Sequence, residues 1–190
     1  MTVTSAPPGR AGFVHDPEAV DAVHRALRQA GVDFAAYLPE TILYPVMRAL
    51  EEDPDVLSVS VAREDEGVAI AAGAFLGGRW PVLLTEASGL GLSALILARA
   101  IVQRTPLLIL AGHNEALGER HDYTAAARRT SEPLLRALGI PYVVVRDKRE
   151  IPVLVREAQL TVRGDRRPVA VLFPRHSLHV DEYAAEDGRA

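Results

Sequence analysis

Apolar residues along the chain follow two different spacings. Short runs of aliphatic and β-branched residues alternate with longer stretches in which apolar residues recur every three or four positions. The short runs predict six strands, at residues 34–38, 57–61, 81–85, 107–111, 142–145 and 169–173. The longer stretches predict helices at residues 17–30, 41–51, 64–75, 90–101 and 150–162, and one that opens at Ser131 and ends at Gly139.

The predicted strands are apolar on both faces and are separated by helices. Such strands are typical of a parallel sheet that is covered on both sides. We therefore predict an α/β fold: a single, open, mostly parallel six-stranded sheet with helices on both faces, built from residues 14–177. Residues 1–13 are expected to be a flexible N-terminus, and residues 178–190 an acidic C-terminal tail.

The composition excludes several classes of protein. The 190 residues include no cysteine, so the chain has neither disulfides nor a thiol nucleophile. Its formal net charge of -4 lacks the basic excess of a nucleic-acid-binding protein. No apolar run reaches the roughly 18 residues that cross a bilayer, and the N-terminus does not resemble a signal peptide. We expect a soluble, cytoplasmic protein whose partners include neither nucleic acid nor a membrane.

Candidate chemistry should lie at the carboxyl ends of the strands, where open parallel sheets bind their ligands. Those ends are residues 39–41, 63–67, 86–91 and 112–121. One of them carries Gly89, Gly91 and Ala94, which match the G-x-G-x-x-A pattern of dinucleotide-binding folds. That pattern usually follows the first strand, whereas here it follows the third. The glycines therefore indicate either an NAD-binding oxidoreductase domain or merely a tight turn with close helix packing.

A second candidate is Glu64, which comes directly after the second predicted strand. Small residues fill the helix that follows it, over residues 67–74. A carboxylate at the tip of a strand, beside a face of small residues, suits a ligand site at a subunit boundary. On spacing alone, Glu64 is better explained as an acid that stabilises a helix N-terminus by about 0.3–1 kcal/mol.

Three segments in order resemble the pyrimidine-binding (PYR) domain of thiamine-diphosphate-dependent enzymes. They are residues 63–75, which contain Glu64, the strand, glycine turn and helix at 81–101, and the strand at 103–113. The resemblance extends over residues 16–174. Within the family, the sequence is similar to free-standing alpha subunits of sulfopyruvate decarboxylases and to phosphonopyruvate decarboxylases. It departs from them at Glu86, Ala87 and Leu92, and in the loop that begins at Gly112.

The resemblance implies a role for each candidate residue. Glu64 would be catalytic, hydrogen-bonding N1′ of the cofactor's aminopyrimidine ring. The other residues implied to line the cofactor are Pro39, Glu40, Thr41, Ser88 and Gly89, and those implied to face the substrate are His113 and His121. For Glu40 and Thr41, capping the following helix is an equally good interpretation.

The resemblance also implies a partner. Family members hold the diphosphate and Mg²⁺ through a Gly-Asp-Gly segment followed by Asn, and only Gly164-Asp165 comes near that pattern. This chain is therefore expected to bind no metal itself and to share thiamine diphosphate with a PP-type beta subunit that holds the Mg²⁺. The implied activity is decarboxylation of a small 2-oxo acid such as sulfopyruvate or phosphonopyruvate. A carboligase subunit, or a non-catalytic α/β module, remains an alternative.

Overall fold

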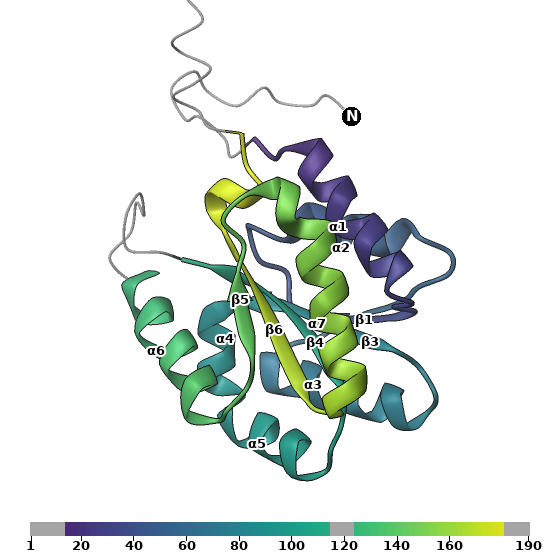
Figure 1. The fold of residues 1–190 in the computed structure, drawn as a ribbon, viewed down its shortest axis with the longest axis vertical. Helices are drawn as coiled ribbons and strands as arrows, with labels where there is room; N and C mark the ends of the chain where they lie inside the picture. The colour runs from purple at the N-terminus through teal and green to yellow at the C-terminus, as the bar shows by residue number, and fades with distance from the viewer. Residues whose placement is uncertain (1–13, 115–123, 181–190) are drawn as a thin grey trace, which may run out of the picture.

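Six parallel strands form the centre of the computed structural model, which describes residues 14–114 and 124–180 (Figure 1). The strands lie in the order β2-β1-β3-β4-β6-β5. Their bounds are β1 Phe34–Tyr37, β2 Leu57–Ser60, β3 Pro81–Glu86, β4 Leu107–His113, β5 Tyr142–Val144 and β6 Pro168–Pro174. Every residue of β1, β4 and β6 is buried, whereas the edge strands β2 and β5 are partly exposed.

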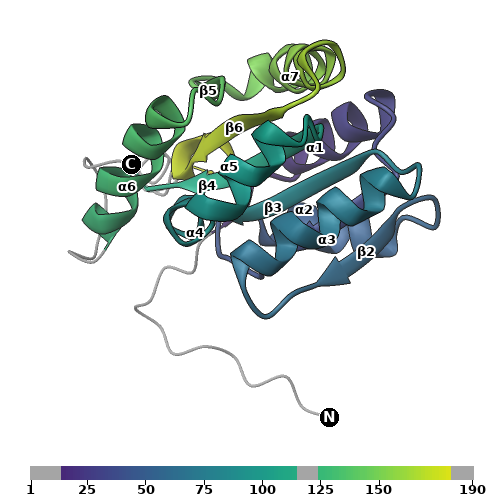
Figure 2. The ribbon, with the colours of Figure 1, turned by 90° about the horizontal axis from the view of Figure 1, so that it is seen from below.

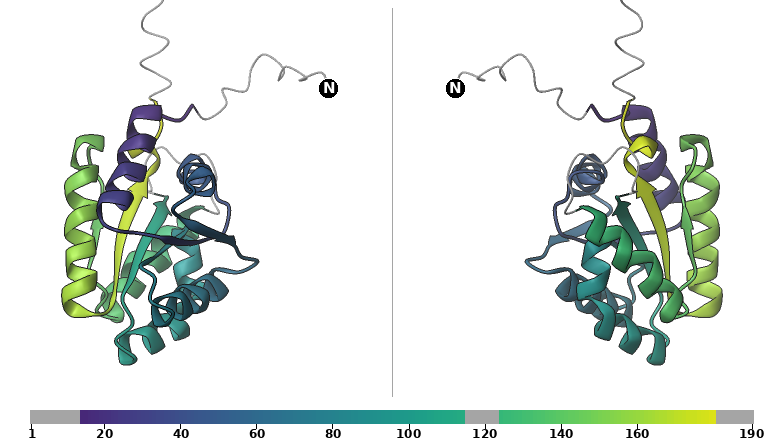
Figure 3. Two further views of the ribbon diagram at one scale, coloured as in Figure 1. Left: turned by 90° about the vertical axis from the view of Figure 1, so that its right-hand side faces the viewer. Right: turned by 90° about the vertical axis from the view of Figure 1, so that its left-hand side faces the viewer.

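Helices cover both faces of the sheet because successive residues of its central strands point to opposite sides. In β4, Leu108 and Leu110 join one apolar cluster and Leu107 and Ile109 join the other. The first cluster is covered by α1 (Pro17–Gln29), α2 (Tyr44–Glu52) and α7 (Ile151–Asp165). The second is covered by α3 (Glu64–Leu76), α4 (Ala87–Leu92), α5 (Ala94–Val102) and α6 (Thr124–Ala137). Figure 2 shows α7 and α3 on opposite sides of the strands, and Figure 3 shows the same layers from two sides.

The predicted fold class is confirmed, with all six strands parallel. Three predicted helix starts are wrong, those of α2, α4 and α6. The helix predicted from Ser131 begins at Thr124, so that Pro133 lies inside it. Burial explains this, because Ala127, Ser131 and Leu135 form one continuous buried stripe that overrides the preference of proline for the first turn.

The helix predicted at residues 90–101 is two helices. The first, α4, already begins at Ala87, so the expected glycine turn is helical. The break falls at Ser93, whose buried hydroxyl donates to the carbonyl of Gly89 at 2.9 Å. Side-chain bonds of this kind compete with the backbone pattern of a helix, and a new helix starts at Ala94.

The strand order creates one crevice at the carboxyl edge of the sheet. From β1 the chain moves to β2 on one side and then returns to β3 on the other side of β1. The connections that leave β1 and β3 therefore diverge, and the space between them is where open α/β sheets bind ligands. The carboxyl ends of the strands lie towards the top of Figure 1.

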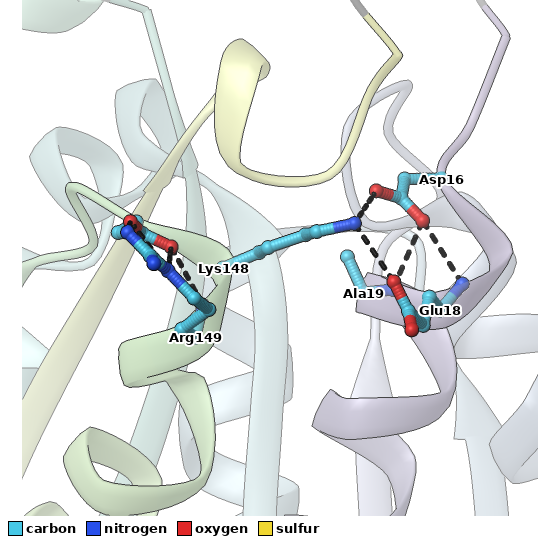
Figure 4. Close-up of polar contacts among 6 residues, drawn as sticks. Asp16, Glu18, Ala19, Lys148 and Arg149 are labelled. Atoms are coloured by element: carbon cyan, nitrogen blue, oxygen red, sulfur yellow. Dashed lines mark hydrogen bonds and ion pairs between the residues drawn. The ribbon is translucent and has the colours of Figure 1, made fainter.

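Hydrogen bonds and ion pairs hold the start of α1 against the rest of the domain (Figure 4). Asp16 caps α1 by accepting from the backbone N–H groups of Glu18 and Ala19. Lys148, in the short helix η1 (Lys148–Glu150), donates to Asp16 at 2.7 Å and to Glu18 at 2.9 Å. The hydrogen bond from Lys148 is the main reason that the pKa of Asp16 lies below its ordinary value.

Backbone pairing ties the two described ends of the chain together. The N–H of Asp16 donates to the carbonyl of Leu178, and that of Val180 donates to Val14, each at 2.9 Å. Leu178 is fully buried, so packing extends beyond residue 177 and the short helix η2 (Arg175–Ser177), whereas Val180 is exposed. Across residues 14–114 and 124–180, none of the helices combines the length and the apolar character that crossing a bilayer requires.

Replacing Asp16 by alanine should lower the free energy of unfolding by about 1 kcal/mol, because α1 loses its cap. Asp21→Ala is the matched control on the same helix, since Asp21 only pairs with Arg25 on the surface. The difference between wild type and Asp16→Ala, measured by urea unfolding, should shrink as the pH falls below about 4, where Asp16 is protonated first in the unfolded chain and, at still lower pH, in the folded chain. Equal losses in both variants would contradict a capping role for Asp16.

Candidate active site

Glu64 lies directly on the backbone of Gly89. It is the first residue of α3, after the extended residue Arg63, and its side chain is partly buried. A methyl group built on Gly89 would lie 2.2 Å from Cγ of Glu64 and 2.7 Å from Oε1. Only glycine leaves room for this contact. The structure thus brings together two residues that the sequence singled out separately.

The contact between Glu64 and Gly89 argues against the dinucleotide-binding hypothesis. That hypothesis needs an open glycine turn that a pyrophosphate can approach closely. Instead, Gly89 is buried within α4 and the space above it holds the Glu64 side chain. Ser88, the residue before it, is partly buried at the start of the same helix.

Glu40 occupies a corresponding position on the other side of the sheet. Its carboxylate accepts from the backbone N–H of Ile42 at 2.8 Å and from that of Leu43. These bonds hold residues 41–43 in a turn, so α2 begins at Tyr44 and not at Thr41 as the sequence predicted. A methyl group on Gly112 would lie 2.7 Å from Oε2 of Glu40, so this carboxylate also packs on a glycine.

The pKa of Glu40 is raised from 4.5 to about 7. Desolvation of the carboxylate by the surrounding protein is the main cause, and the nearby carboxylate of Glu86 acts in the same direction. The two backbone hydrogen bonds and the charge of Arg175 oppose these effects only in part. Glu86 itself, the last residue of β3, accepts from Asn114 Nδ2 at 2.9 Å.

A cavity of about 440 Å³ opens beside Glu40. The residues that line it are His15, Pro39, Glu40, Thr41 and Tyr44. Pro39 and Thr41 are exposed there. His15 reaches the cavity from the segment before α1, and its ring lies 4.4 Å from that of His179 between centroids. Burial and the neighbouring His179 lower the pKa of His15.

His113 lies on the side of β4 that faces α6. Its side chain is only 1% exposed, and Nε2 lies 3.3 Å from Oε1 of Glu132. Tyr142 donates to the other oxygen of Glu132 at 2.8 Å. The structure does not bring His113 to the cavity beside Glu40, and a substrate role for it stays a prediction. His121 lies outside the described residues.

No site role followed from the sequence for several residues that gather at the carboxyl edge, although Glu86, Gly112 and Asn114 lie in two of the strand ends expected to carry chemistry. They are His15, Glu86, Gly112, Asn114 and Arg175. Glu86 and Asn114 carried an available signal, because each is a polar residue at the end of an apolar central strand. His15 and Arg175 carried none, since only the tertiary structure places their segments beside β1. Within residues 14–114 and 124–180, no cluster of three or more His, Asp or Glu side chains is arranged to hold a metal ion.

Comparisons with known proteins identify the family of this chain. The family model described as thiamine pyrophosphate enzyme, N-terminal TPP binding domain, matches residues 17–132. The sulfopyruvate decarboxylase subunit alpha of Methanococcus maripaludis is 33% identical over 156 residues, which cover 82% of this chain and 93% of that protein. A phosphonopyruvate decarboxylase of Streptomyces viridochromogenes is 39% identical over 61 residues, which cover 32% of this chain and 15% of that one.

A solved structure shows the same fold. The 2-oxoglutarate:ferredoxin oxidoreductase from Magnetococcus marinus superposes with a TM-score of 0.65 at 19% identity, over 94% of this chain and 34% of that much longer one. At this identity the likeness concerns the fold alone. The family match and the methanogen relative carry the assignment: the chain belongs to the thiamine pyrophosphate enzymes, and residues 17–132 form their N-terminal TPP binding domain.

Proposed function

We propose that the chain is the pyrimidine-binding alpha subunit of a two-component, thiamine-diphosphate-dependent 2-oxo-acid decarboxylase. Sulfopyruvate and phosphonopyruvate are the candidate substrates, because the relatives named above act on them. The observation that carries the proposal is the placement of Glu64 at the carboxyl edge of the sheet, fixed against Gly89. When bound, thiamine diphosphate supplies the electron sink that lets a 2-oxo acid release CO₂.

Glu64 fits the aminopyrimidine end of this cofactor. Its side chain is partly exposed at the crevice, while the backbone of Gly89 limits its movement on the other side. A carboxylate held in this way can share a proton with N1′ of the pyrimidine ring and keep that ring in one orientation. Ser88 and Gly89 would line the same end of the cofactor.

An apolar surface next to Glu64 suits a partner subunit. We define the docking face as the exposed residues Ala69, Gly73 and Leu76 of α3 with Leu95 and Val102 of α5. Leu76, Leu95 and Val102 are 82%, 72% and 83% exposed, and α3 and α5 contact each other. Exposed apolar patches of this kind mark protein interfaces, and small residues let a partner helix approach closely.

We infer that the docking face binds the PP-type beta subunit. The helix α3 runs from Glu64 into this face, so a protein seated there would complete the crevice at Glu64. The methanogen relatives are named as alpha subunits, which implies a second subunit in those proteins. In this chain the beta subunit would supply the groups that hold the diphosphate and Mg²⁺.

Glu64→Gln should lower kcat for CO₂ release by at least about 100-fold, because glutamine cannot take part in proton sharing at N1′. The assay combines the chain with thiamine diphosphate, Mg²⁺ and the candidate beta subunit, on sulfopyruvate and phosphonopyruvate. Glu66→Gln, in the same exposed turn, is the control and should stay within about twofold of wild type. Activity of the unpaired chain, or an unimpaired Glu64→Gln enzyme, would refute this assignment.

Gly89→Ala should lower the free energy of unfolding by about 1–3 kcal/mol, because its methyl group would overlap Glu64. The loss should largely disappear in a Glu64→Ala background, which a double-mutant cycle measures. Gly91→Ala is the control, since its methyl group would meet Thr130 at an ordinary 3.6 Å. NAD binding that is lost in Gly89→Ala but kept in Glu64→Gln would instead support the dinucleotide hypothesis.

Leu95→Glu should weaken association with the beta subunit by at least about tenfold, because it places a charge in the apolar docking face. Leu160→Glu is the matched control: Leu160 is 62% exposed but lies on α7, in the opposite helix layer. Affinity can be measured by sedimentation or calorimetry on the purified subunits. If both variants bind as wild type does, the docking face lies elsewhere.

A further inference from the structure

The carboxyl end of β3 lies between two glutamates that each pack on a glycine. Glu64 contacts Gly89 on the α4 side, and Glu40 contacts Gly112 on the side covered by α1, α2 and α7. Glu86 ends β3 and Gly89 follows within one helical turn. The two carboxylates therefore flank the same short segment from opposite faces of the sheet.

Glu40 differs from Glu64 in facing a cavity of its own. The cavity of about 440 Å³ is large enough for a small organic acid, and Glu40 lines it together with His15 and Tyr44. Two further charged groups act on Glu40 from neighbouring elements: Glu86 at the end of β3 and Arg175 in η2. An acid, a cation and a cavity thus meet at the carboxyl edge of the sheet, the edge at which Glu64 also lies.

We propose that Glu40 is the proton donor of this site, delivering a proton to the carbon of the 2-oxo acid that loses its carboxylate. This inference rests on the proposed function. The bond between C1 and C2 of the 2-oxo acid breaks, CO₂ leaves, and C2 takes the proton of the Glu40 carboxyl group. Glu40 then regains a proton from water, so that the 2-oxo acid anion and one proton yield an aldehyde and CO₂.

The environment of Glu40 suits this role. A general acid works best when its pKa lies near the working pH, and desolvation with the repulsion of Glu86 brings the pKa of Glu40 to about 7. A second role is also visible, since the carboxylate holds the turn at Ile42 and Leu43. Ile42 and Leu43 donate to different oxygens of Glu40, so glutamine at position 40 keeps one of the two turn bonds and cannot donate a carboxyl proton. The pH profile of Glu40→Gln therefore separates the two roles, because a lost turn bond does not remove a titrating limb.

The first experiment measures the carboxyl group directly, without catalysis. The full-length chain is labelled with ¹³C at the glutamate carboxyl, and Glu40→Gln identifies the Glu40 signal in NMR spectra. We expect this signal to titrate with a midpoint near 7. In Glu86→Gln the midpoint should fall, because a repelling carboxylate is removed, while Glu86→Gln retains an oxygen that Asn114 can bind. A midpoint in the ordinary glutamate range, about 4 to 5, would overturn the proposal.

The second experiment follows kcat/KM against pH in the assembled enzyme. Because the protonated form is the active one, the rate should fall as the pH rises through the pKa of Glu40. Glu86→Gln should move this fall to lower pH, and Arg175→Gln should move it to higher pH, since the two groups act on Glu40 with opposite sign. Glu40→Gln should lower kcat by about 100-fold or more and remove this limb of the profile.

The outcomes separate the two proposals. A Glu40→Gln enzyme that is slow but keeps the wild-type limb would show a structural role only and would overturn the donor assignment. An active wild-type enzyme whose rate is unaffected by Glu40→Gln would do the same, leaving the proposed function intact. Absence of decarboxylation by the wild-type assembly would count against the proposed function itself, whatever the NMR titration shows.

Discussion

Burial of both faces of the central strands is the constraint from which the rest of this structure follows. Strands such as β4 and β6 have no exposed residue, so helices must cover the sheet on both sides. Each strand must then connect to the next through a helix, and all strands run parallel. Polar side chains can approach the sheet only at its edges and at the ends of its strands. The carboxyl edge, where the connections diverge beside β1, is therefore where the carboxylates gather.

Two glycines decide how closely those carboxylates approach the backbone. Gly89 and Gly112 lie on different elements, yet each leaves the space that a glutamate side chain fills. In each pair, the backbone atoms of the glycine limit the positions that the glutamate carboxylate can take, so its orientation does not depend on a salt bridge. For Glu40 the same close packing removes water, which raises the pKa of the carboxyl group. The absence of a side chain at Gly89 and Gly112 thus fixes the position of each glutamate side chain, and for Glu40 it also contributes to the raised pKa of the carboxyl group.

Under the proposed function, the domain supplies one half of a cofactor site. Its helices on the α3 side end in exposed leucine and valine side chains, whereas an isolated globular domain would cover such a surface with polar groups. Glu64 opens α3, the helix that ends at the exposed Leu76. The family to which the chain belongs, and the alpha-subunit names of its methanogen relatives, agree with a protein that completes its cofactor site through association.

The sequence by itself determined the six strands and the α/β class, and it singled out Glu64 as a candidate, because spacing of apolar residues and a motif are local properties. It could not locate the start of α6, since the buried stripe through Ala127 depends on what the helix packs against. Nor could it pair Glu64 with Gly89, or Glu40 with Gly112, because these contacts join segments that only the parallel order of the strands brings together. The tertiary structure alone decided which carboxylates lose their water, since desolvation depends on everything that surrounds a group and not on its neighbours in sequence.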